Sequence, residues 1–466
     1  MDEVFTTGLS AIRAELLIED LPAAAVAEAN AAARAGPTDA SMQDLTDLPF
    51  VTVDPPGSRD LDQALHITAE GDGWVVYYAV ADLAMFVRPG GAIDQAARAR
   101  GSTIYFPDQK SPLHPVALSE GAASLLAGEI RSALVWRVRL NASGEVVDVD
   151  VRRARVRSRG AYTYQQVQAA LDGGTADPVF EFLRDAGQAR ASLQARRGGL
   201  DLRLPDQTVI VTNGKYELVY RAPLPVEGWN AQVSLLVGEC AARLMLDAGI
   251  GVLRTMPPPT PDTVDRLRRH ARALGVPWPE ATGYAAFVRS LDPRVADQAA
   301  LIVQSAKLAR GAAYLGFTQA PTGDVTHAAV AAPYAHVTAP LRRLVDRFAN
   351  EITLAACAAA TTPQWASAAV AELPALMARA HDRERAAERL VVSLAEAAVL
   401  AGCVGTVVNG VVVDAGPHHA TVQLARPAVV ADVAIGSAGI GLGDEIRLRV
   451  ATADPRTRTV VLEPLD

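Results

Sequence analysis

The chain has 466 residues, of which 50% are hydrophobic and 21% charged, and its formal net charge is −8. This composition is typical of a soluble globular protein of roughly two to four domains. No apolar run is long enough to span a membrane and the acidic N-terminus lacks the layout of a signal peptide, so we expect a cytoplasmic protein. Three widely spaced cysteines exclude a disulfide framework, and the negative charge disfavours nucleic-acid binding unless basic residues cluster.

Residues 1–48 read as two or three short helices with few aromatic residues. Leu9, Ile12, Leu16 and Leu17 form an apolar stripe, and an Ala-rich second helix ends near Arg34. Such a segment is either a helix-turn-helix-like module or a cap that packs on the next domain. We favour the cap, because the segment carries few basic residues.

The next part of the chain begins as β structure and continues as helices, which predicts an α+β domain over residues 49–394. The hydrophobic pattern predicts a hairpin across Asn213-Gly214 and a helix that begins at Thr260-Pro261. The other predicted strands are Phe50–Val53, Ala64–Ile67, Trp74–Val80, Leu134–Leu140 and Val146–Val156, and the other predicted helices are Ile93–Arg100, Tyr162–Leu171, Asp177–Leu200, Asn230–Leu246, 297–312, 340–358 and 363–400.

Short β-runs return between about residue 402 and residue 466. Six runs in so few residues suit a small barrel, and an OB-fold over residues 395–466 is the favoured interpretation. This segment has no Phe, Tyr or Trp, and its five Arg are outnumbered by seven acidic residues. Because OB-folds that hold single strands stack bases on aromatic rings, we expect a weak grip on nucleic acid here.

The most informative stretch is an acidic loop after the first predicted strand. Asp54, Asp60 and Asp62 fall within nine residues, and Pro55-Pro56-Gly57 forces a tight turn between them. Carboxylates that lie this close repel one another unless a cation sits among them, and all-oxygen ligation favours Mg²⁺ or Mn²⁺. A solvated acidic turn is the alternative, and spacing alone does not decide between them.

A second segment combines aromatic, hydroxyl and basic residues ahead of a predicted helix. Pro340 is expected at the first helical position, which would place Arg342 and Arg343 in the first turn, where backbone N–H groups favour phosphate. Pairing of these arginines with Asp346 or Glu351 along the helix is the alternative. The segment also contains Tyr334, His336 and Thr338.

Basic residues also gather in three short runs, around Arg152–Arg159, Arg342–Arg347 and Arg383–Arg389. Each run alone is most simply a solvated face. Together they would allow a local basic channel in an otherwise acidic protein.

Three motifs, taken in chain order, resemble the ribonuclease II/ribonuclease R (RNB) family of 3′→5′ exoribonucleases. The first is Asp54-x5-Asp60-x-Asp62-x-Ala64, in which Gln63 stands where the family has a fourth acidic residue. The others are Gly101-Ser-Thr-Ile-Tyr105-Phe-Pro and Tyr334-Ala-His-Val-Thr-Ala-Pro-Leu-Arg-Arg343. The resemblance implies an RNB catalytic domain, followed by an S1-like barrel.

The resemblance also implies roles for individual residues. Two Mg²⁺ ions, or Mn²⁺, would be held by Asp54, Asp60 and Asp62 with Gln63, with Arg342 as the phosphate clamp. Tyr105 would stack on the last nucleotides, and the family's second aromatic clamp is missing from residues 207–212. The remaining substrate-binding residues would be Tyr334, His336, Thr338, Arg343 and Glu388, and Asp82 is a speculative addition to the metal cluster.

The implied activity is processive hydrolysis of RNA from single-stranded 3′ ends by a monomeric enzyme, with release of nucleoside 5′-monophosphates. A catalytically impaired RNA-binding protein on the same fold is the main alternative, because Gln63 brings no charge. A metal-dependent phosphodiesterase that acts only on short oligonucleotides is a third possibility, which the barrel's poor binding surface would permit.

Overall fold

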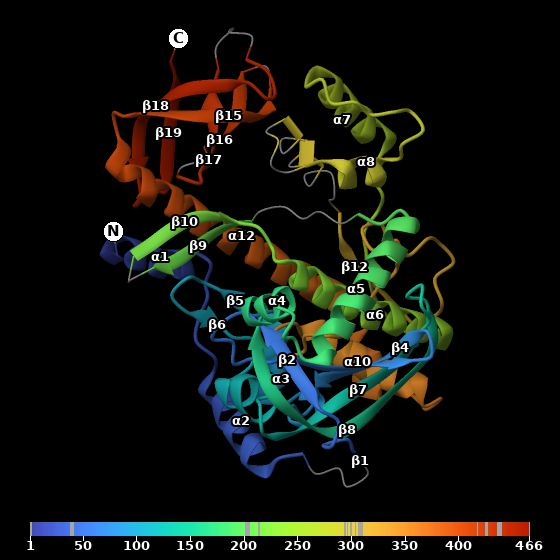
Figure 1. The fold of residues 1–466 in the computed structure, drawn as a ribbon. Coiled ribbons are helices and arrows are strands. Elements are labelled where there is room, and N and C mark those ends of the chain that lie inside the picture. The colour runs from blue at the N-terminus through green and yellow to red at the C-terminus, as the bar shows by residue number, and fades with distance from the viewer. Residues whose placement is uncertain are drawn as a thin grey trace.

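The computed structural model describes residues 2–37, 42–200, 206–212, 215–292, 295, 297–298, 301–302, 304–305, 311–416, 418–424, 427–435 and 440–465. Figure 1 shows a large mixed body, a small barrel at the C-terminal end, and a long helix that connects them. The expected α+β class is therefore confirmed. The turn at Asn213-Gly214 and half of the residues in the helix expected at 297–312 lie outside the described residues.

The body is built on a six-stranded sheet of order β1-β8-β2-β3-β4-β7, and a further pairing of β8 with β7 closes most of it into a ring. The long strand β8 makes this possible, because its first part pairs antiparallel with β7 and its last part runs parallel to β2. The sheet strands are β1 (Gln43–Asp44), β2 (Phe50–Asp54), β3 (Gln63–Glu70), β4 (Gly73–Ala81), β7 (Ile130–Leu140) and β8 (Val146–Thr163).

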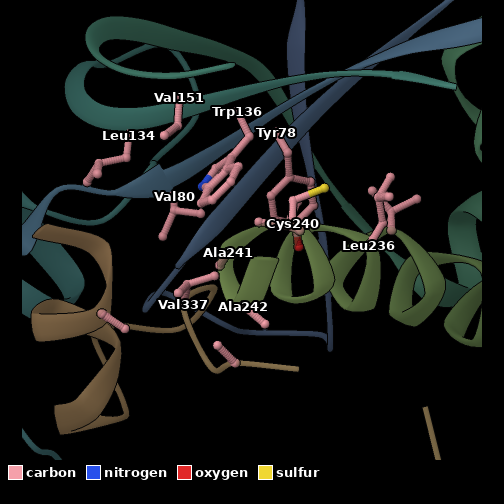
Figure 2. Packing of buried hydrophobic residues seen from close by; sticks show 14 of the residues in the cluster. Tyr78, Val80, Leu134, Trp136, Val151, Leu236, Cys240, Ala241, Ala242 and Val337 are labelled. Atoms are coloured by element: carbon pink, nitrogen blue, oxygen red, sulfur yellow. The ribbon is translucent and has the colours of Figure 1, made fainter. Parts of the chain in front are cut away.

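The core lies between this sheet and helix α6 (Pro225–Ala248). Figure 2 shows Tyr78 and Trp136 on the strands facing Cys240 and Ala241 on the helix. Small residues on α6 let the helix approach the sheet closely, so the large rings fill the space between them. Trp136 is fully buried, and Tyr78 is 1% exposed. This packing fixes the strands that border the candidate site.

The remaining helices surround the sheet or extend from it. Figure 1 shows α7 and α8 in a lobe near the barrel, and α12 running diagonally from the body to the barrel. The helices are α3 (Ala92–Arg100), α4 (Tyr164–Asp172), α5 (Pro178–Arg196), α7 (Pro261–Ala273), α8 (Tyr284–Ser290), α10 (Leu344–Cys357), α11 (Gln364–Ala369) and α12 (Leu373–Leu400), with short helices η1 (Leu83–Met85), η2 (Leu118–Ala122) and η3 (Ala401–Cys403).

Short strand pairs complete the body. The hairpin expected around residue 213 is confirmed by the pairing of its two strands, with Val211 opposite Tyr216. The pairs are β5 (Ile104–Tyr105) with β6 (Lys110–Ser111), β9 (Asp206–Thr212) with β10 (Lys215–Arg221), β11 (Gly251–Thr255) with β12 (Ala313–Phe317), and β13 (Thr326–His327) with β14 (Ala332–Pro333).

The start of helix α10 differs from the sequence-based expectation. The helix begins at Leu344, and the extended residue Arg343 is its N-cap, so Pro340 is not the first helical residue. The backbone before the helix pairs with the segment after α3: Thr103 N donates to Arg342 O at 3.0 Å, and Leu344 N donates to Gly101 O at 3.0 Å. Tertiary pairing therefore overrides the local proline signal, and the two arginines precede the helix.

The C-terminal barrel has five strands in the order β17-β16-β15-β18-β19 and is nearly closed. Two of the six expected β-runs belong to one continuous strand, because β15 bends at a bulge between Val412 and Asp414 instead of ending. The strands are β15 (Val407–Ala415), β16 (His419–Leu424), β17 (Val430–Ala434), β18 (Glu445–Asp454) and β19 (Thr459–Pro464).

The N-terminal segment forms helices α1 (Asp2–Glu15) and α2 (Ala23–Ala35). In Figure 1, α1 lies beside α12 near the barrel. Leu9 and Ile12 are fully buried, as expected from the stripe, but Leu17 is 80% exposed because it follows the helix in a left-handed turn with φ 53°. At the α12 interface Gly8 abuts Leu394, so closely that a Cβ would lie 2.7 Å from the Leu394 methyl carbons. Among the helices that the structure describes, none is long and apolar enough to cross a membrane.

Candidate active site

The acidic loop joins two neighbouring antiparallel strands, so both ends of the loop lie at the same end of that strand pair. β2 ends at Asp54, β3 begins at Gln63, and the two strands pair antiparallel at Val51 and Leu65. Gly57 takes φ 81° in the turn, a conformation that suits glycine. The returning limb is anchored by Ser124, whose hydroxyl accepts from the Leu61 N–H at 2.9 Å. The loop between β2 and β3 therefore reverses direction and brings the three aspartates close to one another.

The loop lines a cavity of about 370 Å³, which we call the carboxylate cavity. All three aspartates of the motif reach it, together with Gln63 at the family's fourth acidic position, Tyr105 and Arg342. Its polar lining residues are Asp54, Ser58, Asp60, Asp62, Gln63, Tyr78, Tyr105, Tyr164, Glu227, Asn230 and Arg342.

Asp62 is the most deeply placed of the three carboxylates, at 4% exposure. One oxygen accepts from the Leu341 N–H at 2.7 Å, and the other lies 3.3 Å from Arg342 Nε. Burial raises the pKa of Asp62 to about 7 even though Arg342 and the Leu341 N–H act in the opposite direction. The second motif segment is therefore docked directly onto the acidic loop.

Asp54 and Asp60 have opposite electrostatic surroundings. Burial raises the pKa of Asp54 to about 6, and the nearby charge of Asp60 adds to this shift, whereas Arg342 opposes it. Burial also acts to raise the pKa of Asp60, but hydrogen bonds from Lys110 and Tyr105 outweigh it and hold the pKa below its ordinary value. Lys110 Nζ donates to one Asp60 oxygen at 2.7 Å, and the Tyr105 hydroxyl donates to the other at 2.8 Å.

The donors in the carboxylate cavity suit an oxygen-preferring divalent cation. Asp54 and Asp62 are partly or fully buried carboxylates whose pKa values are raised by burial, so a divalent cation beside them would stabilise their ionised form. Gln63 adds an amide whose oxygen accepts from the buried Tyr78 hydroxyl. In the described part of the chain, however, no three His, Cys, Asp or Glu side chains gather closely enough to hold a metal. Both oxygens of Asp60 are engaged, one by Lys110 and the other by Tyr105.

A second cavity of about 650 Å³ adjoins the first and shares Tyr105 and Arg342 with it; we call it the outer cavity. Glu388 on α12 lines it, as does His336, whose Nδ1 lies 2.6 Å from the Tyr314 hydroxyl. Burial, reinforced by Arg343, lowers the pKa of His336 well below its ordinary value, so the ring is neutral. The other polar or aromatic lining residues are Thr103, Phe106, Thr208, Arg254, Arg343, His381 and Glu384.

The two arginines of the motif have different partners. Arg343 binds Asp346 with two hydrogen bonds of 2.9 and 3.0 Å, which is the pairing along the helix that the sequence left open. Arg342 instead faces Asp62, and its side chain is 43% exposed. Of the two arginines, Arg342 therefore lines both cavities, whereas Arg343 lines the outer cavity alone and is bound to Asp346.

Tyr334 and Thr338 line neither of the two cavities. Tyr334 is 7% exposed and packs against Gly238 of α6, where a Cβ would lie 2.1 Å from the ring. Thr338 is 2% exposed, and its hydroxyl lies 3.0 Å from the Ser234 hydroxyl. Both residues dock the motif onto α6, which positions Arg342.

Two further sequence-based ideas do not match the geometry. Asp82 does not line the carboxylate cavity, because it binds Arg153 at 2.6 Å and Ser132 at 2.9 Å. Four of the five arginines in the first basic run pair with acidic neighbours: Arg152 with Asp150, Arg153 with Asp82 and Glu351, Arg155 with Asp44, and Arg159 with Asp177.

Sequence reasoning missed several polar residues at the site. Tyr164, Asn230 and Glu227 line the carboxylate cavity, and Asn230 Nδ2 donates to the Tyr164 hydroxyl at 3.3 Å. Lys110, which holds Asp60, was also missed. A signal for Lys110 exists, since it is one of only three lysines in a chain that otherwise uses arginine. No comparable signal marks Tyr164, which reaches the cavity through tertiary packing.

The fold and the site define a class: proteins that join an RNB body, with an acidic loop facing an arginine, to a C-terminal S1 barrel. The RNB domain model matches residues 42–357, and the model of the RNase II-type exonuclease C-terminal S1 domain matches residues 406–465. The chain belongs to the RNB family.

Curated relatives agree with this assignment. The chain is 28% identical over 337 residues to exosome complex exonuclease RRP44 homolog A of Arabidopsis thaliana, which covers 67% of this chain and 35% of the relative. It is 27% identical over 322 residues to ribonuclease R of Vibrio cholerae, which covers 65% of this chain and 38% of the relative. The chain thus spans little more than a third of the length of these relatives.

Solved structures share the fold. The apo form of Mycoplasma genitalium RNase R superposes with a TM-score of 0.87 at 18% identity, which covers 99% of this chain and 78% of that one. Yeast Ssd1, described as a pseudonuclease, superposes with a TM-score of 0.70 at 16% identity, which covers 91% of this chain and 54% of that one.

Proposed function

We propose that this protein is a metal-dependent, processive 3′→5′ exoribonuclease that hydrolyses RNA to nucleoside 5′-monophosphates, preferring single-stranded 3′ ends. The observation that carries the proposal is that Asp54, Asp60 and Asp62 line one cavity with Tyr105 and Arg342. These residues come from separate segments of the chain, and the fold brings them to one place. Membership of the RNB family supports the same reaction class.

Nucleases of the RNB family typically use Mg²⁺. Here Asp54, Asp62 and Gln63 would hold the ion, and Mn²⁺ could replace it because oxygen ligands suit both. When bound, the ion supplies an activated water and stabilises charge on the departing oxygen. Arg342 would neutralise charge on the scissile phosphate, since its guanidinium faces both cavities. Asp60 would keep Tyr105 at the cavity mouth through its hydrogen bond.

The two adjoining cavities support a route for the RNA. The terminal nucleotide would occupy the carboxylate cavity, and the nucleotides behind it would lie in the outer cavity, past His336 and Glu388. Tyr105 lines both and is 55% exposed, so its ring is available to stack on a base. Asn230 and Tyr164 offer hydrogen-bonding groups for the ribose 2′-hydroxyl, which would favour RNA over DNA. Mycoplasma genitalium RNase R has been solved with single-stranded and double-stranded RNA.

A linear RNA of about thirty nucleotides and its circular form test the proposed polarity, both with Mg²⁺. We expect progressive shortening of the 5′-labelled linear RNA to a short 5′ core, with mononucleotides as the other product. The circular RNA, which has no 3′ end, should stay intact. Linear fragments from the circular RNA would show internal cleavage and would contradict the proposal.

A catalytically impaired RNA-binding protein is the second candidate function. Gln63 favours it, because the family's fourth acidic residue is absent, and the shared fold of Ssd1 shows that the architecture also occurs in a pseudonuclease. The same assay separates the two functions: an unchanged linear RNA in Mg²⁺ and in Mn²⁺, together with a gel shift, would favour binding without turnover. A length series of substrates would separate either from a phosphodiesterase restricted to short oligonucleotides.

We further propose a monomeric cytoplasmic protein divided at residues 1–48, 49–394 and 395–466. Helix α12 runs from Leu373 to Leu400 and so crosses the second boundary as one rigid connection. The charged groups that the barrel presents are mostly acidic, so RNA binding would depend chiefly on the catalytic domain. The N-terminal helices would serve as a cap, which is supported by the packing of α1 on α12 and of α2 beside α3.

A further inference from the structure

Asp60 differs from the other two aspartates because a lysine already neutralises it. The Lys110 ammonium lies 2.7 Å from one Asp60 oxygen and 2.9 Å from a Glu120 oxygen. The side chains of Lys110, Asp60 and Glu120 are 23%, 13% and 17% exposed, so the three charges are largely shielded from solvent. The Arg59 side chain also approaches Glu120, but at 3.8 Å and 66% exposure, where an ion pair contributes little.

A small hairpin, β5 with β6, places this ammonium beside Asp60. In the pairing of β5 with β6, Tyr105 stands directly opposite Lys110, so both side chains lie on the same face. The two residues then bind the two oxygens of Asp60. Glu120 reaches the ammonium from η2, just before Ser124, the residue that anchors the acidic loop. The strand pairing with Tyr105 thus positions Lys110, and Asp60 and Glu120 both bind its ammonium.

The choice of lysine is itself informative. The chain has only three lysines, Lys110, Lys215 and Lys307, and uses arginine for all its other basic side chains. An ammonium is a compact point charge with three donors, whereas a guanidinium is a flat fork. A compact cation between two carboxylates resembles a bound ion more closely than an arginine could. Lys110 does not line the carboxylate cavity, so it fills no space that RNA needs.

We propose that the Lys110 ammonium, held by Glu120, takes the place of one metal ion, so that the site binds a single divalent cation at Asp54, Asp62 and Gln63. This inference rests on the proposed function for its setting but concerns the metal count alone. The balance of charge in the site also agrees with a single divalent ion. With every carboxylate ionised, as ligands of a bound cation would be, the three aspartates and Glu120 carry four negative charges, and Lys110 and Arg342 carry two positive ones. The remaining two negative charges match one divalent ion, and an uncharged Gln63 fits that balance.

The count can be measured without RNA, from the loss of the free aqueous Mn²⁺ signal in electron paramagnetic resonance as the full-length chain is added. We expect about one Mn²⁺ per chain for the unmodified protein. Lys110→Met keeps the length of the side chain but removes its charge, which frees Asp60 and Glu120, so we expect about two. Lys215→Ala, the matched control at a lysine on β10, should stay at about one.

A count of two or of none for the unmodified protein would overturn the inference, as would an unchanged count and affinity in Lys110→Met. If Lys110→Met does not fold, the unmodified protein still decides, together with Glu120→Gln, which leaves the ammonium on Asp60 and should keep one ion. The result is separable from the proposed function. A protein that binds one ion but leaves RNA intact would contradict only the nuclease, and a nuclease that binds two would contradict only the role of Lys110.

Discussion

Three aspartates within nine residues have different chemistry because each meets different neighbours. Asp62 is buried against the Leu341 N–H and Arg342, Asp54 is partly buried beside Asp60, and Asp60 is bound by Lys110 and Tyr105. The sequence predicts that the three lie together, since the turn after Asp54 leaves little choice. It does not reveal that Asp60 is already neutralised, because Lys110 is fifty residues away in the chain and reaches Asp60 only through tertiary packing.

The raised pKa values of Asp54 and Asp62 predict how stability depends on pH when no divalent metal is present. Their ordinary value is 3.8, against about 6 and about 7 in the folded protein, and burial is the main cause. Between pH 4 and pH 7 the folded state therefore binds more protons than the unfolded chain. The contribution of these two groups to the free energy of unfolding therefore falls as pH rises through this range, by on the order of a few kcal/mol for the two together.

Thermal melting in EDTA at pH 5 and at pH 8 measures this contribution. The unmodified protein should lose more Tm between pH 5 and pH 8 than the variant with Asp54→Asn and Asp62→Asn, whose amides do not titrate. Equal losses in the two proteins would show that these carboxyls titrate normally.

Tyr105 is expected to set the length of the final product by stacking on a base near the 3′ end. Tyr105→Ala removes the ring and should change the length of the 5′-labelled core, which a sequencing gel resolves to one nucleotide. Tyr105→Phe keeps the ring but removes the hydroxyl that binds Asp60, so the core length should not change. If Tyr105→Ala leaves the same core, stacking by this ring does not determine where degradation stops.

Among the elements, those with strong local signals were predicted well. The strand Trp74–Val80, the helix Ile93–Arg100 and the helix start at Pro261 are all confirmed. The main error at this scale is the start of α10, where Pro340 suggested a helix but the backbone of Arg342 and Arg343 pairs with residues 101–103. A proline shows where a helix can begin, but here the pairing with residues 101–103 keeps Arg343 extended, and the helix begins at Leu344.

Helix α4 offers a test of how an element supports the site. Its N-cap, Thr163, accepts from the Gln166 N–H at 3.2 Å, and the Gln166 side chain accepts from the Thr163 N–H at 2.8 Å, directly before Tyr164 in the cavity. Thr163→Ala removes one half of this capping box and should lower the free energy of unfolding by about 1 kcal/mol.

The measurement is chemical denaturation of Thr163→Ala beside Thr163→Ser, which keeps a hydroxyl and should stay close to the unmodified protein. A weaker preference for RNA over DNA in the alanine variant would connect the cap to the placement of Tyr164. Equal stability of the two variants would mean that the hydroxyl does not hold the helix start.

For the whole molecule, the order of parts was predictable and their spatial relation was not. The α+β body, the C-terminal barrel and the N-terminal helices were all expected and are confirmed. The helix predicted over 363–400 already runs past the second domain boundary, and the structure divides it into α11 and α12, of which α12 connects the body to the barrel. Sequence patterns do not show that α1 packs against α12 through Gly8 and Leu394. That contact joins residues hundreds of positions apart, for which local periodicity carries no information.

The central claim is that the cavity around Asp62 degrades RNA even though Gln63 replaces an acidic residue. The most direct measurement follows a 5′-labelled single-stranded RNA of about thirty nucleotides with the unmodified protein and with Asp62→Asn, in Mg²⁺ and in EDTA, and records RNA binding by gel shift. Asp148→Asn, at a surface ion pair with Arg137, is the matched control. We expect Mg²⁺-dependent shortening by the unmodified and control proteins, and a loss of at least about 100-fold in Asp62→Asn with binding retained. An intact RNA with the unmodified protein, bound in Mg²⁺ and in Mn²⁺, would contradict the account and identify an RNA-binding protein.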